Sequence, residues 1–291
     1  LVEPDRPVVI FAEGSAGRMN DRVQPMLDGS ALIARTAARR RAKQQPPGKV
    51  VVHPLAFKYF FRGDLVAAVE PVLSGIERQL NWPVHNGSEL LPRIRQIGLE
   101  LLAQQEIKYL GKAQPEQSNP RCLHDRLEGL IEAMLAPLEK RYATTGGRSV
   151  YIRVQQVRTK LLPDLIAGRL TAEEETERHE QLKLLYDAQE MACYPRDYLG
   201  QHPSAERVLE TVEKLEENLT DRVTVHRPFD CVMQVGDAIE VSPHRLRKST
   251  PEKLVESTRD KPLASLDPLT DQVERSIQSM VDGLSGRGAK P

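Results

Sequence analysis

The sequence has few of the residues that mark several classes of protein. Only 4% of the 291 residues are aromatic, one of them tryptophan, and there are three cysteines. Cys122, Cys193 and Cys231 are odd in number, widely spaced and without the rhythm of metal ligands. We therefore interpret them as free thiols in a reducing compartment, and expect no bound metal.

The chain also lacks net charge and long hydrophobic runs. Lys+Arg and Asp+Glu number 41 each, so the chain has no net positive charge to attract nucleic acid. No nucleic-acid partner is therefore expected. No apolar run approaches the roughly 20 residues of a membrane-spanning helix, and no signal peptide is visible. These absences predict a cytoplasmic location. Peripheral contact with the inner face of the membrane stays open.

The most specific stretch lies near the beginning, from residue 8 to residue 29. Val8–Phe11 are β-branched or aromatic and predict a strand buried on both faces. The run ends at Ala12-Glu13-Gly14, which places a carboxylate and a glycine at the strand end where open α/β sheets bind ligands. A polar, arginine-bearing loop follows, and then a helix from near Asp28. Because such a strand begins within seven residues of Leu1, we interpret the chain as N-terminally incomplete.

Strand and helix patterns alternate at both ends of the chain. A helix over 30–43 and a strand over 49–57 follow the first strand, and strand–helix–strand over about 50 residues predicts a right-handed crossover with parallel pairing. Apolar residues at helical spacing fill 64–226, where Thr171 with Glu174 predicts a capping box. Strand character returns at 229–235 and 238–241, and a final helix covers 269–284. These patterns predict an α/β fold, with a mostly parallel sheet flanked by helices and a long all-helical insertion.

Four short motifs carry a resemblance to a known family. Phe11-Ala12-Glu13-Gly14 resembles the Phe-Pro-Glu-Gly motif of the glycerolipid acyltransferases, and Gly29-Ser30-Ala31 resembles the glycine that starts their next helix. His53-Pro54-Leu55 resembles their Val-Pro element, and VMQVGDAIEV at 232–241 resembles a later Val-x-x-Gly-x-Pro-Ile strand. The resemblance is good over residues 7–62, thinner over 229–243 and weak elsewhere.

The resemblance implies an acyltransferase of phospholipid biosynthesis. Such an enzyme moves a fatty acyl group from an acyl thioester, acyl-CoA or acyl carrier protein, to a hydroxyl of glycerol phosphate or a lysophospholipid, without a cofactor. It implies that residues 1–63 are the C-terminal part of the acyltransferase core, 64–226 the helical insertion, and 227–291 returning core strands with a terminal helix. The substrate-binding residues that it implies are Glu13, Gly14, Ser15, Arg18 and Arg22, with Phe11, Gly29 and Pro54 in support.

Three departures from the family pattern matter. Ala12 stands where the family has proline, and Ala16 where it has arginine, so Arg18 or Arg22 would have to supply the phosphate contact. The family's catalytic Asn-His-x-x-x-x-Asp is absent, because none of the seven histidines has aspartate at that spacing. The resemblance therefore places the general base upstream of Leu1 and predicts that this chain alone is inactive.

Other interpretations of these residues stay open. Arg18 is equally a phosphate ligand or a solvated loop charge. The run Arg39-Arg40-Arg41 is either a solvated helix face or a site that attracts anionic lipid headgroups. A second function is a catalytically inactive acyltransferase-like core that carries a helical partner-binding module. A nucleotide- or phosphate-ester-binding enzyme ranks last, since neither G-x-x-x-x-G-K-[ST] nor G-x-G-x-x-G occurs.

Overall fold

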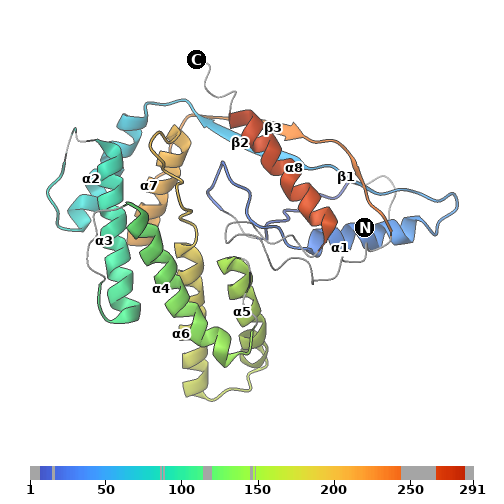
Figure 1. Ribbon diagram of the computed structural model, residues 1–291, viewed down its shortest axis with the longest axis horizontal. Helices are drawn as coiled ribbons and strands as arrows, with labels where there is room; N and C mark the ends of the chain where they lie inside the picture. The colour runs from blue at the N-terminus through green and yellow to red at the C-terminus, as the bar shows by residue number, and fades with distance from the viewer. Residues whose placement is uncertain are drawn as a thin grey trace. The chain divides into compact units, whose positions relative to one another are not determined.

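The chain forms two compact units, each with its own core. The computed structural model describes residues 7–14, 17–85, 87, 89–113, 120–144, 147, 149–243 and 267–285. Unit 1 comprises residues 1–62 and 228–291, and unit 2 comprises residues 63–227 (Figure 1).

Unit 1 combines two short antiparallel sheets with two helices. Its elements are α1 (Gly29–Arg41), β1 (Val51–Val52), β2 (Leu55–Phe61), β3 (Phe229–Val235), β4 (Ile239–Glu240) and α8 (Pro268–Ser285). β1 pairs with β4, and β2 pairs with β3 along its whole length, from Leu55 opposite Val235 to Phe61 opposite Phe229.

The predicted α/β fold with a mostly parallel sheet is wrong. Of the described residues, 58% are helical and 8% lie in strands, and both sheets that they form are two-stranded and antiparallel. The single strand predicted over 49–57 is two strands, because His53-Pro54 separates β1 from β2. Each of them pairs with part of the returning segment at 229–241. At this break the Gly236 N–H donates to the Pro54 carbonyl at 2.8 Å. This hydrogen bond joins the two segments between the two short sheets.

The predicted buried strand at Val8–Phe11 is also wrong. These residues lie outside any strand, and Val9 and Phe11 are 72% and 84% exposed. β-propensity expresses how well a side chain fits a pleated, half-buried surface, so it gives a strand only where a neighbouring strand is present. No strand in the described part of the chain pairs with this segment.

One face of β2 packs on α8, which crosses the strand obliquely in Figure 1. Ala56 of β2 is buried in a small apolar cluster with Met280 and Val281 of α8. A second cluster joins α1, the end of β4 and the beginning of α8, through Ala31, Ala38, Val241 and Leu269. The C-terminal helix α8 is thus the element that holds α1 and β2 in one body.

Unit 2 is entirely helical within its described residues. Its helices are α2 (Leu65–Gln79), α3 (Leu90–Leu110), α4 (Pro120–Arg141), α5 (Val150–Ile166), α6 (Ala172–Met191) and α7 (Ala205–Thr220). The helical spacing of apolar residues predicted for 64–226 is confirmed in α4, because Leu127, Leu130, Ile131, Met134 and Leu138 are all buried in the main core with α5 and α6. The capping box of Thr171 and Glu174 at the start of α6 is confirmed as well.

Candidate functional site

Residues 12–28 are called here the 12–28 loop, and their described parts, 12–14 and 17–28, are irregular but joined at the two ends. The Leu27 N–H donates to the Ala12 carbonyl at 3.0 Å, which joins the two ends of the loop. Gly14 has φ of 69°, a left-handed conformation that glycine adopts without steric cost. The turn that opens the loop therefore favours the glycine of the motif. Ser15 lies outside the described residues.

Glu13 lies close to Gln24 of the same loop and to Glu274 of α8. The side chain is half-buried, and its carboxylate accepts a hydrogen bond from the Gln24 N–H. Burial raises the pKa of Glu13, the Gln24 N–H lowers it, and the nearby Glu274 carboxylate raises it, with a net increase. Glu13 thus stabilises the fold of the loop by supplying an acceptor to a backbone N–H across it.

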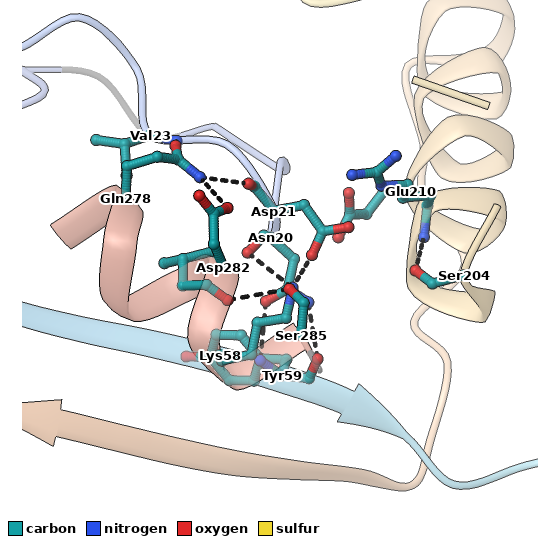
Figure 2. A network of polar contacts seen from close by, with 12 residues as sticks. Asn20, Asp21, Val23, Lys58, Tyr59, Ser204, Glu210, Gln278, Asp282 and Ser285 are labelled. Carbon is teal, nitrogen blue, oxygen red and sulfur yellow. Dashed lines mark hydrogen bonds and ion pairs between the residues drawn. The ribbon is translucent and has the colours of Figure 1, made fainter. Parts of the chain in front are cut away.

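Side chains of α8 anchor the second half of the 12–28 loop (Figure 2). The Val23 N–H donates to Gln278 Oε1 at 2.9 Å, and Gln278 Nε2 donates to the Asp21 carbonyl at 3.0 Å. The Met26 N–H donates to Glu274 Oε2 at 2.9 Å. A loop without secondary structure of its own therefore has its backbone groups paired by a helix 248 to 257 residues later in the chain.

β2 anchors the middle of the loop through two consecutive residues (Figure 2). The Asn20 side-chain amide pairs with the backbone of Tyr59 as a neighbouring strand would, with Nδ2 donating to the carbonyl at 2.7 Å and Oδ1 accepting from the N–H at 2.8 Å. Asp21 forms an ion pair with Lys58, and both side chains are more than nine-tenths buried. The loop is thus fixed to the sheet next to the residues anchored by α8.

The end of the loop is tied to α1 and α8. Asp28, which precedes α1, accepts a hydrogen bond from the Thr270 hydroxyl at 2.8 Å instead of capping its own helix. Arg35 of α1 forms a buried, bidentate ion pair with Asp267 at 2.6 and 2.8 Å.

The supporting residues from the motif comparison have different surroundings. Phe11 is largely exposed, and Pro54 lies between β1 and β2. Gly29 begins α1, but a Cβ atom there would meet nothing within 4 Å, so packing gives no reason for glycine at this position.

Arg18 and Arg22 are the two cationic residues of the loop, and both are exposed. Arg22 stands between Asp21 and Val23, the two residues whose backbone groups bind Gln278. A guanidinium on a fixed backbone is suited to bind phosphate through charge-assisted hydrogen bonds. The N–H groups of Val23 and Met26 are taken by side-chain oxygens, so a phosphate would be bound chiefly by arginine side chains.

The residues that fix the loop could not be identified from the sequence. Asn20, Asp21, Glu274 and Gln278 have no motif, and their distance in sequence from their partners hides the contacts. Lys58 did carry a signal, because a single lysine inside the apolar run of 55–61 requires a buried acceptor or carboxylate.

Comparisons with known protein families, with curated proteins and with solved structures find no match for this chain. Within the described ranges, no helix is long and apolar enough to cross a membrane. Over the same residues, no group of three or more histidine, cysteine or acidic side chains is arranged to hold a metal ion.

Proposed function

We propose that this chain takes part in acyl transfer from an acyl thioester to a hydroxyl of glycerol phosphate or a lysophospholipid, and that the 12–28 loop binds the phosphate of that acceptor. The motif resemblance suggests the reaction. The observation that carries the proposal is that the loop containing the Glu-Gly motif is fixed by both β2 and α8 while Arg18 and Arg22 on it stay exposed.

The corrected fold changes the basis of this proposal. Val8–Phe11 are not part of a sheet, so the argument from a sheet edge no longer applies. Support comes instead from the loop itself, whose backbone is determined by hydrogen bonds independent of any strand before it. A preorganised loop loses little conformational entropy when it binds a ligand.

The proposed reaction needs no metal or organic cofactor. The acceptor oxygen attacks the thioester carbonyl, the C–O ester bond forms, the C–S bond breaks, and a general base moves the hydroxyl proton to the departing thiolate. We assign no residue of this chain to that base. Coenzyme A or acyl carrier protein would be the thiol partner, and a lysophospholipid acceptor would bring the protein into peripheral contact with a membrane.

Glu13 has a supporting role in this proposal. Its carboxylate would repel a phosphate dianion, and it is already engaged with the Gln24 N–H. We therefore assign it to ordering of the loop, and assign the phosphate contact to Arg18 and Arg22.

Calorimetric titration of the chain with sn-glycerol 3-phosphate at low salt tests the proposal. Arg22→Ala is expected to weaken binding at least tenfold, since a hydrogen bond to a charged group contributes about 1.5–3 kcal/mol. Arg40→Ala is the matched control, because Arg40 is an exposed arginine of unit 1 near the far end of α1. The proposal fails if the unaltered chain does not bind, or if the two variants weaken binding equally.

One observation favours the second function, a helical partner-binding module. Unit 2 has a groove of about 660 Å³ between α2 and α7, where Ala68, Pro71 and Gly75 leave room opposite Leu219. The same titration separates the two functions. A chain that acts only through unit 2 would give no heat with glycerol 3-phosphate and no response to Arg22→Ala.

A further inference from the structure

A single side chain, that of Gln278, holds both peptide groups that flank Arg22. Its Oε1 accepts from the N–H of Val23, and its Nε2 donates to the carbonyl of Asp21 (Figure 2). The first of these groups belongs to the peptide plane after the Arg22 Cα and the second to the plane before it. Because peptide groups are planar, holding both planes fixes the backbone dihedrals of Arg22 and the direction in which its side chain leaves the loop.

Asp282 determines which way round the Gln278 amide lies. Gln278 Nε2 donates its second hydrogen to Asp282 Oδ1 at 2.8 Å, one helical turn further along α8. A carboxylate only accepts hydrogen bonds, so the amino group of Gln278 must face Asp282 and the Asp21 carbonyl. The oxygen then necessarily faces the Val23 N–H.

The residue before Arg22 is fixed independently from the other side. The Asp21 carboxylate is buried against Lys58 of β2, and Asn20 is paired with Tyr59 of the same strand. Arg22 therefore lies where the anchors from β2 and from α8 meet. Arg22 is exposed, and its backbone is held on both sides.

We propose that Gln278, oriented by Asp282, is a positioning residue that fixes Arg22 and so sets the affinity of the 12–28 loop for a phosphorylated acceptor. The inference rests on the proposed function, since it assumes that Arg22 contacts the phosphate. Gln278 itself does not touch the ligand. It acts by reducing the conformational freedom that Arg22 loses on binding.

Two readouts test this role: hydrogen exchange of the Val23 amide in the ligand-free chain, and calorimetric affinity for sn-glycerol 3-phosphate. Gln278→Ala is expected to speed Val23 exchange at least tenfold and to weaken binding about tenfold. Gln272→Ala, an exposed glutamine on the same helix, is expected to change neither. Asp282→Ala leaves Gln278 in place and should change the exchange rate and the affinity in the same direction but by less. Asp282→Asn keeps an acceptor oxygen and should leave both close to those of the original chain.

A double-variant cycle distinguishes positioning from general stabilisation. If Gln278 acts through Arg22, Gln278→Ala weakens binding in the original chain but adds no further loss in an Arg22→Ala background. Equal losses in both backgrounds would overturn the positioning role, as would unchanged Val23 exchange in Gln278→Ala. An unaltered chain that fails to bind glycerol 3-phosphate would overturn the proposed function instead, and faster Val23 exchange would still show that Gln278 holds the backbone at Arg22.

Discussion

The buried ion pair between Asp21 and Lys58 gives the sharpest prediction about stability. The two side chains are 9% and 4% exposed, and the Lys58 ammonium also lies 3.5 Å from the Asn20 carbonyl. Asp21→Asn removes the negative charge while keeping the shape of the side chain, so the ammonium stays buried without its compensating carboxylate. Removing one partner of such a pair typically costs about 3–5 kcal/mol, and we expect a loss of this size in the free energy of unfolding of unit 1.

Hydrogen exchange of the β2 amides, measured as a function of urea, reports the opening of unit 1 separately from unit 2. Asp230→Asn is the matched control, because the Arg62–Asp230 pair of the same sheet is 44% and 62% exposed and should contribute less than about 1 kcal/mol. Lys58→Met combined with Asp21→Asn removes both charges and should recover most of the loss. A cost below about 1 kcal/mol for Asp21→Asn would refute the burial of this pair.

Three further predictions concern unit 2. Thr171→Ala removes the cap of α6 and should lower the unfolding free energy by about 1 kcal/mol in urea melts followed by circular dichroism, with exposed Thr176 replaced as the control. Leu185→Ala empties a fully buried site and should cost about 2–5 kcal/mol in the same assay; a loss below 1 kcal/mol would contradict the packing of α6. Burial lowers the pKa of His226 below 6.5, so at acidic pH His226 binds a proton more readily in the unfolded chain than in the folded chain. The free energy of unfolding should therefore fall as the pH drops below about 6.5, and His226→Phe should remove that dependence.

Local sequence patterns predicted the helices well. The apolar residues at helical spacing in 64–226 include the buried face of α4, and the capping box of Thr171 and Glu174 is formed as expected. Helical periodicity and capping act over three to eight residues, so the sequence window that predicts them contains all the information needed.

The strand pairing could not be read in the same way. Residues 229–235 form a strand as predicted. A strand pattern in the sequence does not indicate which strand it pairs with, or whether the pairing is parallel or antiparallel. The parallel prediction came from the helix expected between the first two apolar runs, whereas the structure pairs β2 with a strand about 170 residues away. The strand predicted over 49–57 includes Pro54, whereas in the structure Pro54 lies between two strands.

The loop shows the same division between local and distant information. The motif comparison singled out Glu13, Gly14 and Arg22, and the turn at Gly14 and the half-buried Glu13 carboxylate give two of them structural roles. It could not find Gln278 or Glu274, because their partners in the loop lie 248 to 257 residues earlier. A long-range carboxamide contact has no sequence signature in a single chain.

The most direct test of the account is a nuclear magnetic resonance titration of the isotopically labelled chain with sn-glycerol 3-phosphate. The account predicts that the amide shifts that change lie in residues 17–24, that they saturate with ligand, and that Arg22→Ala abolishes them. Shifts confined to α2 and α7, or no saturable change in residues 17–24, would contradict the assignment of the 12–28 loop as the acceptor site.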